Sequence, residues 1–213
     1  MTRAPETPSA ARTTGLWRHP HILPLLPLGL LSNGGVMAIQ TLWAGPYLTE
    51  VLGLDNTHMA HMLLAIMLTL MASYVALSFL SGWLHRRFTL VQMGVAGHVA
   101  SIPVIVAIAF LPWREAAWLW LLLVMTVPLM SLVQPGLAVL FPRSIAGRVL
   151  TLYNLFIFLG AFLMQWGIGL VVEALQAQGV ARALSYQMAL GGLATVQMGC
   201  LAWWGVFRRR DGA

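Results

Sequence analysis

The sequence predicts an all-α integral membrane protein, built as a bundle of six transmembrane helices. The first observation behind this prediction is composition. Of the 213 residues, 59% are hydrophobic and only 8% are charged, whereas a soluble domain usually carries about 25% charged residues. The mean hydropathy is +0.81. This composition excludes a soluble enzyme, a disordered tail and a disulfide scaffold, and the single cysteine, Cys200, has no partner for an intrachain bridge.

The second observation is the alternation of long apolar stretches with short polar breaks. A hydrocarbon core about 30 Å thick takes roughly 20 residues of helix, and six stretches are long enough to cross it. The breaks are too short for a soluble domain and carry charge or turn-forming residues. We therefore predict a cytoplasmic arginine-containing tail (1–21), one six-helix membrane domain (22–207) and a cytoplasmic C-terminal tail (208–213). The six spans cover residues 22–47, 58–84, 90–111, 116–141, 145–172 and 183–207.

The third observation is the placement of the basic residues, all twelve of which are arginine. Ten fall in the N-terminal tail, the second and fourth connections and the C-terminus, while two fall in the third and fifth connections. Cytoplasmic loops carry an excess of basic residues, so we expect both termini in the cytoplasm and the spans in the cell (inner) membrane. The ten are Arg3, Arg12, Arg18, Arg86, Arg87, Arg143, Arg148, Arg208, Arg209 and Arg210, and the two are Arg114 and Arg182.

The high pI and the N-terminal sequence each allow one other interpretation. A pI near 10.7 would suggest nucleic-acid binding in a soluble protein, but this chain has too little polar surface for that. Residues 36–38 faintly resemble a signal-peptide cleavage site. The apolar segment continues past them to Tyr47, which favours a retained transmembrane helix.

The first span combines a polar face with a flexible point. Spacing of three and four residues places Asn33, Met37, Gln40 and Ala44 on one side of a helix. The pair Gly34-Gly35 beside Asn33 would loosen the helix or admit a close neighbour. A functional interpretation is favoured here because polar residues coincide with a glycine break.

The fourth span is interrupted by Pro128 and Pro135, on either side of Ser131 and Gln134. A proline frees a backbone carbonyl that lipid cannot satisfy, so this span should kink and face protein or a wet cavity. In the fifth span, helical spacing aligns four residues on one face. Amides in such positions commonly hydrogen-bond neighbouring helices as packing contacts. These residues are Asn154, Phe158, Ala161 and Gln165.

The third and sixth spans carry small residues at helical spacing, a pattern that lets helices pack closely. No Asp, Glu, Lys or Arg lies in the middle of any span, which argues against a self-contained proton pump or ion channel. The one mid-span ionisable residue, His98, is interpreted as a histidine hydrogen-bonded between helices, with proton coupling as the alternative. The small residues are Gly94, Gly97 and Ser101 in the third span and Gly191, Thr195 and Gly199 in the sixth.

The second span carries a small and polar stripe that suits a helix–helix interface. At its outer end, His58, His61 and Met62 combine imidazole with thioether, which suits a soft ion such as Cu(I), so copper transport is a minor alternative. We expect no bound metal, no cofactor and no catalytic residues. His98 has no mid-depth partner for haem, and nucleotide-binding, zinc and catalytic motifs are absent. The stripe consists of His58, Met62, Ala65, Thr69, Ser73 and Ala76.

Three stretches resemble the major facilitator superfamily of transporters. Residues 140–154, which lead into a span with Gly160, are similar to its short cytoplasmic loop and penultimate helix. Residues 34–55 resemble the first helix of its C-terminal half. Residues 81–88 stand where the family carries a glycine–acid–basic loop signature, and here the acidic residue is missing. The resemblance covers residues 22–207.

The family usually has two six-helix halves around a central cavity, each half an inverted 3+3 repeat, and this chain resembles the second half. The resemblance implies that the first and fourth spans line the cavity, the second and fifth meet the other half, and the third and sixth face lipid. It implies alternating access, with five residues of this half contacting a small-molecule substrate. These are Asn33, Gln40, Ser131, Gln134 and Asn154.

The function predicted on this basis is transport of a small solute by a half-length transporter, which is self-paired, paired with a separate six-helix chain, or a fragment. A charged substrate would find its counter-charge in the partner half, because this half has no mid-span charge. The alternative is a non-transporting membrane subunit or assembly factor, whose polar faces would pack against a partner. The expected partners are the lipid bilayer, the second half and the substrate, and no nucleic acid.

Overall fold

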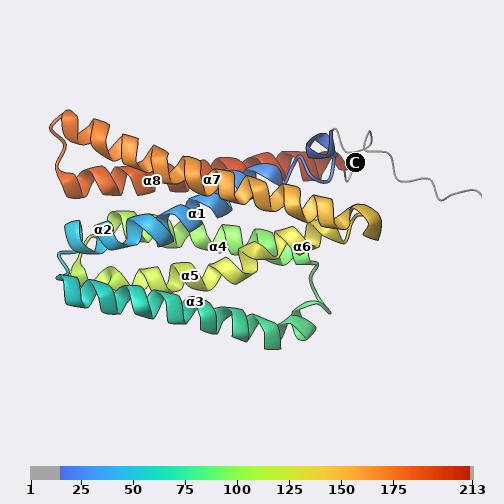
Figure 1. Ribbon diagram of the computed structural model, residues 1–213, viewed down its shortest axis with the longest axis horizontal. Coiled ribbons are helices and arrows are strands. Elements are labelled where there is room, and N and C mark those ends of the chain that lie inside the picture. The colour runs from blue at the N-terminus through green and yellow to red at the C-terminus, as the bar shows by residue number, and fades with distance from the viewer. Residues whose placement is uncertain (1–14, 212–213) are drawn as a thin grey trace, which may run out of the picture.

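The computed structural model describes residues 15–211, with side chains as far as Arg208, and this part of the chain is helical without strands (Figure 1). Arg3 and Arg12 of the expected tail lie outside it, as do the side chains of Arg209 and Arg210. The elements are η2 (Leu16–Arg18), η3 (Leu28–Asn33), α1 (Gly34–Ala38), η4 (Ile39–Trp43), α2 (Ala44–Glu50), α3 (Asn56–Leu84), α4 (Leu90–Phe110), η5 (Arg114–Trp118), α5 (Leu119–Ser131), α6 (Val133–Ala138), α7 (Arg143–Ala177) and α8 (Arg182–Asp211).

Within residues 15–211, five helices are long and apolar enough to cross a bilayer: α3, α4, the run Arg114–Ala138, α7 and α8. They coincide with the second to sixth predicted spans, so the all-helical membrane class is confirmed. The run Arg114–Ala138 breaks between α5 and α6 at Leu132, as the prolines predict.

The first predicted span takes a form that the sequence analysis did not anticipate. Residues 26–50 are helical without interruption, but π-helical segments, η3 and η4, alternate with the α-helical segments α1 and α2. We call residues 28–50 the segmented helix. η4 ends three residues before Pro46, which has no N–H to donate and whose ring crowds the carbonyl one turn back. A wider π turn relieves this conflict.

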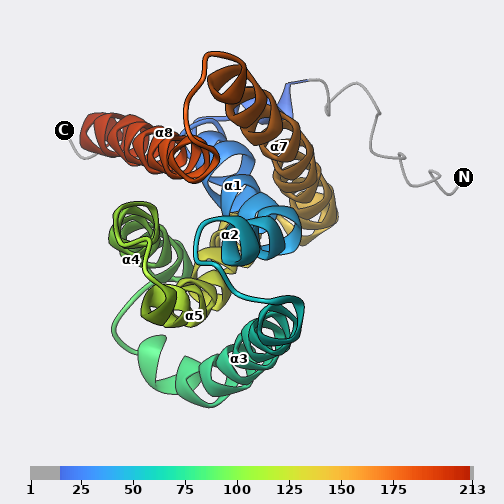
Figure 2. The ribbon, with the colours of Figure 1, turned by 90° about the vertical axis from the view of Figure 1, so that its left-hand side faces the viewer.

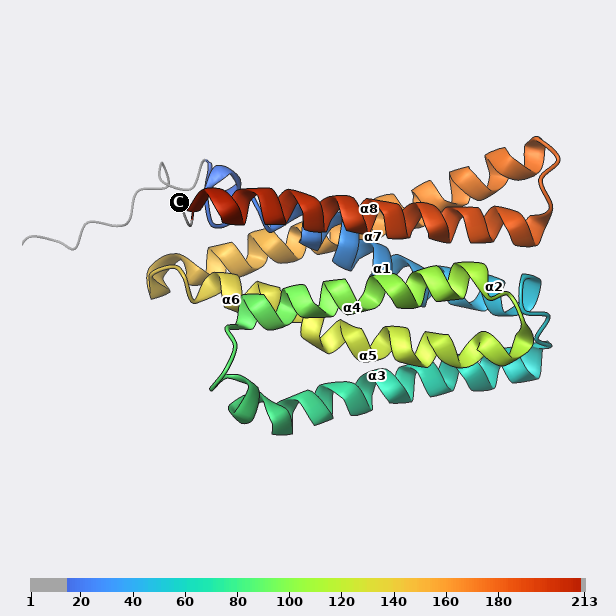
Figure 3. The same ribbon diagram turned by 180° about the vertical axis from the view of Figure 1, so that it is seen from behind.

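The segmented helix occupies the centre of the bundle. Its first half packs against α7 and α8, and its second half packs against α3 (Figure 2). Seen from behind, α4 lies between α8 and α5 (Figure 3). Helix α3 is the most peripheral element, with Ile66 as its one buried residue.

The ends of the helices sort the arginines as the sequence predicts. The α3–α4 and α6–α7 connections lie at the end of the bundle where α8 finishes, and the α2–α3, α4–α5 and α7–α8 connections lie at the opposite end (Figure 1). Within the described side chains, six arginines lie at the first end and two at the second. One of these two, Arg182, forms an ion pair with Glu50, with 3.3 Å between Nε and Oε2. We call the first end the arginine-rich end; its described members are Arg18, Arg86, Arg87, Arg143, Arg148 and Arg208.

Small residues serve packing in the third predicted span but not in the sixth. A Cβ added to Gly94 would lie 2.7 Å from the nitrogen of Val133, and one added to Gly97 would lie 2.6 Å from the nitrogen of Met130. The close packing expected of α4 is therefore confirmed. The expectation for Gly191 and Gly199 is wrong within this chain, because a Cβ added at either position would have no heavy atom within 4 Å apart from its chain neighbours and the backbone of its own helix. Helix α8 buries a different stripe, formed by Ser185, Ala189, Leu193, Gln197 and Cys200.

Candidate functional site

The two predicted amides of the segmented helix, Asn33 and Gln40, lie in its π-helical segments. Asn33 ends η3 and Gln40 belongs to η4, and each is 8% exposed. The Oε1 atom of Gln40 is buried and has no hydrogen-bond partner among the described residues. A buried polar atom without a partner costs about 1–3 kcal/mol, and such atoms also occur in His98, Trp120, Tyr153 and Gln197.

A polar link joins the segmented helix to α7 one residue beyond Gln40. Nε2 of Gln165 donates to Oγ1 of Thr41 at 3.1 Å, and Oγ1 of Thr41 donates to the carbonyl of Met37 at 2.7 Å. Nε1 of Trp43 donates to the carbonyl of Gln165 at 3.2 Å. Thr41 is exposed, as is its neighbour Leu42. Sequence reasoning noted Gln165 on the fifth span but missed Thr41, because the π segment changes which residues share a face.

The kink between α5 and α6 explains the environment of Ser131. The amide of Leu132 donates to the carbonyl of Leu129 instead of to that of Pro128. Oγ of Ser131 donates to the carbonyl of Pro128 at 2.7 Å and so satisfies it. The hydroxyl therefore repairs the backbone at the kink, which is a structural role.

Gln134 and Asn154 lie near each other at the junction of α6 and α7. Nε2 of Gln134 donates to the carbonyl of Leu150 at 3.2 Å, one turn before Asn154. Asn154 is exposed, and no other part of the described chain hydrogen-bonds its side-chain amide. Gln134 thus joins α6 to α7, and the side-chain amide of Asn154, one turn farther along α7, is free.

The predicted residues do not gather at one point, because the contacts made by them or their neighbours meet α7 at different heights. Gln134 meets α7 at Leu150, the backbone next to Asn33 meets it at Gly160, and the polar link meets it at Gln165. At 1.5 Å per residue, these contacts extend over roughly 22 Å. The arrangement is a polar track along α7, with the unsatisfied Gln40 near one end and the free amide of Asn154 near the other.

His98 forms a buried hydrogen bond between helices, as the sequence analysis preferred. Its Nδ1 atom lies 2.7 Å from Oγ of Ser32. Nε2 of Gln197 on α8 donates to the carbonyl of Ser32 at 3.3 Å. Three elements, η3, α4 and α8, therefore meet at Ser32, on the opposite side of the segmented helix from Thr41.

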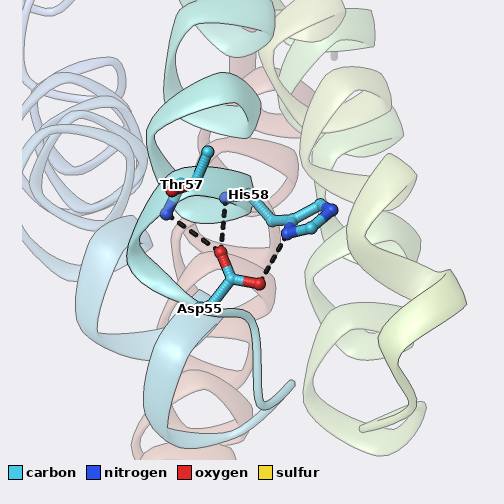
Figure 4. A network of polar contacts seen from close by, with 3 residues as sticks. All are labelled: Asp55, Thr57 and His58. Carbon is cyan, nitrogen blue, oxygen red and sulfur yellow. Dashed lines mark hydrogen bonds and ion pairs between the residues drawn. The ribbon is translucent and has the colours of Figure 1, made fainter.

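His58, in the first turn of α3, takes part in a helix cap (Figure 4). Oδ1 of Asp55 accepts from the backbone nitrogens of Thr57 at 3.0 Å and His58 at 2.9 Å. Its Oδ2 lies 2.6 Å from Nδ1 of His58. The hydrogen bonds from the backbone and ring of His58 hold the pKa of Asp55 below its usual value. Among the described side chains, residues 15–208, no three of His, Cys, Asp or Glu are grouped as metal ligands.

Long apolar helices that run in alternating directions through one bundle are typical of a multi-pass α-helical membrane protein. A family model, Major Facilitator Superfamily, matches residues 2–165, which is 164 of the 213 residues. The chain belongs to the major facilitator superfamily, a family of membrane transporters. The match ends inside α7, so α8 lies outside it. No curated protein and no solved structure matches the chain.

Proposed function

We propose that this chain is one six-helix half of a major facilitator-type transporter, and that it moves a small solute by alternating access together with a second half. The family membership and the five apolar helices support the transporter class. In this proposal the segmented helix is the first of six spans, the five apolar helices are the other five, and residues 22–207 form the 3+3 repeat. The arginine-rich end and both termini face the cytoplasm at the inner membrane.

The observation that carries this proposal is the polar link on the exposed side of the segmented helix. Thr41 is exposed and accepts a hydrogen bond from Gln165. The apolar side chains of Phe158 and Phe162 on α7 are exposed as well. Oε1 of Gln165 accepts no hydrogen bond from the described residues, and lipid would offer it none, so this side is better suited to a wet cavity. We place the solute against the polar track, where Gln40 and Asn154 offer unused hydrogen-bonding atoms and Asn33 stands between them. Ser131 and Gln134 shape the track through their backbone contacts.

The second half is proposed to meet the exposed faces of α3 and α7. These helices lie on either side of α2 (Figure 2), and both expose large apolar side chains, among them Met71 and Phe79 on α3 and Trp166 on α7. The second half is a second copy of this chain or a separate six-helix chain. Because no mid-span charge is present on this half, the proposed solute is neutral or finds its counter-charge in the partner.

Uptake into proteoliposomes tests the proposal. The chain is reconstituted alone and with the product of the adjacent reading frame, and accumulation of a radiolabelled hexose, nucleoside and amino acid is followed. We expect one assembly to accumulate one solute class. Gln40→Ala should slow accumulation about tenfold, the effect of losing one hydrogen bond to the solute, whereas Gln178→Ala, in the exposed α7–α8 turn, leaves it unchanged. Native mass spectrometry of the active assembly identifies the second half.

Two results would count against the proposal. Uptake by Gln40→Ala at the wild-type rate would remove Gln40 from the solute site. A stable assembly with a partner that accumulates none of the solutes would favour a non-transporting membrane subunit.

A further inference from the structure

A groove opens at the arginine-rich end, between η2 and the first turns of α7. Its volume is about 600 Å³, and its walls include Trp17 from η2 and Arg143, Ser144, Arg148, Leu152 and Leu155 from α7. The α7 residues 144, 148, 152 and 155 repeat at intervals of three and four, so they follow one face of the helix. None of the residues that form the polar track lines this groove.

The two arginines of the groove have no counter-charge nearby. Arg143 and Arg148 are exposed, and neither guanidinium group forms a hydrogen bond or an ion pair within the described range. The acidic side chains within residues 15–208 all lie toward the opposite end of the bundle, at Glu50, Asp55, Glu115 and Glu173. The groove is therefore positively charged and is suited to binding an anion.

The backbone and hydroxyl groups at the start of α7 add to this positive potential. The N-cap residue is Pro142, which has no side-chain hydrogen bond to offer the first turn. The N-terminal amides of a long helix carry partial positive charge when they are uncapped. The hydroxyl of Ser144 lies in the groove beside them and donates to no described residue.

The groove changes from charged to apolar along its length. From Arg143 to Leu155 the helix rises about 18 Å, from a headgroup depth into the hydrocarbon region. At the shallow end, the guanidinium of Arg18 stacks over the ring of Trp17 at 4.4 Å. Tryptophan and arginine are typical of the membrane–water interface, and leucine is typical of the acyl region.

A ligand that matches this gradient carries a phosphate at one end and an alkyl chain at the other. We propose that the groove binds an anionic phospholipid, with its phosphate between Arg143 and Arg148 and the first part of one acyl chain along Leu152 and Leu155. Basic pockets at the cytoplasmic ends of membrane helices are suited to such headgroups. This proposal rests on the membrane-protein assignment and is independent of the transport site.

Native mass spectrometry of the detergent-purified full chain, titrated with phosphatidylglycerol, tests the proposal. We expect one molecule to bind more tightly than the rest and more tightly than phosphatidylcholine with the same acyl chains. Each arginine near an anionic headgroup contributes about a fivefold change in affinity. Arg143→Gln/Arg148→Gln should therefore weaken the tight site roughly thirtyfold. The matched control, Arg86→Gln/Arg87→Gln, removes the same charge at the same end and should leave it unchanged.

Three outcomes would overturn the proposal. They are equal weakening by the two double variants, equal affinity for the two lipids, and displacement of phosphatidylglycerol by inorganic phosphate at the lipid's own concentration. The last outcome would show that the groove binds phosphate without any contribution from the acyl chain. If the double variant does not fold, the single variants Arg143→Gln and Arg148→Gln carry the same test, each with about a fivefold loss.

Discussion

Gly34 and Gly160 face each other where the segmented helix crosses α7. A Cβ added to Gly34 would lie 2.7 Å from the carbonyl carbon of Gly160 and 2.6 Å from the nitrogen of Ala161. A Cβ added to Gly160 would collide with the carbonyl group of Leu30. The two backbones are therefore in direct contact, and this contact fixes the height at which the segmented helix crosses α7, between the two ends of the polar track.

Substitution of Gly34 by alanine should therefore destabilise the bundle, because backbone atoms cannot yield as a side chain does. We expect a loss of about 1–3 kcal/mol in the free energy of unfolding. The measurement is thermal or denaturant unfolding in detergent. Gly191→Ala is the control, since its added Cβ meets nothing and alanine stabilises a helix by about 0.5–1 kcal/mol relative to glycine. Equal stability of the two variants would show that the helices do not cross in contact.

Ser32→Ala should also destabilise the fold, by leaving Nδ1 of the buried His98 without its hydrogen bond. An unpaired buried polar atom costs about 1–3 kcal/mol. Thr195→Val is a suitable control, because the exposed hydroxyl of Thr195 bonds only within its own helix, to the carbonyl of Gly191. The double variant Ser32→Ala/His98→Leu should recover part of the loss. Full tolerance of Ser32→Ala would remove Ser32 from the junction of η3, α4 and α8.

The cap of α3 should make stability depend on pH. The folded pKa of Asp55 is lowered by its hydrogen bonds from His58, so its contribution is complete above the ordinary aspartate pKa of about 3.9. That contribution is lost as the pH falls through the lowered folded value. We therefore expect Asp55→Ala to lower Tm at pH 7, and the difference from wild type to shrink below about pH 4.

The control for the cap is Glu115→Ala, at an exposed carboxylate in η5 that accepts no hydrogen bond within the described range. Its Tm difference from wild type should stay small at every pH. A difference for Asp55→Ala that is constant between pH 7 and about pH 3 would contradict the cap, since a protonated carboxyl cannot hold both backbone amides as the ionised group does.

The sequence predicts the helices well because their ends depend on local chemistry. The apolar stretches and the prolines at the α5–α6 break lie within a few residues of the features they cause. Arginine placement predicts which connections share an end. These signals need no knowledge of which helix packs against which.

The candidate site is predicted less well, because it depends on turns that change the helical period. An ideal helix places Gln40 with Asn33, but the π segments expose Thr41 and join it to Gln165. Pro46 was the available signal, since a proline can force a π turn before it. The wrong prediction for α8 has a different cause. Gly191 and Gly199 show only that close packing is possible on their face, whereas the buried stripe that includes Gln197 lies on the face that actually contacts the bundle.

Water accessibility of Thr41 is the most direct test of the proposed pathway. Cys200 is the chain's single cysteine and is buried, so Cys200→Ala provides a background for Thr41→Cys and Gln165→Cys. Val99→Cys, at an exposed position on α4, is the control for a lipid-facing site. The measurement is labelling of intact membranes by a membrane-impermeant maleimide, which reacts with hydrated thiols. We predict labelling at 41 and 165 and none at 99; labelling at neither 41 nor 165 in the active assembly would contradict the pathway.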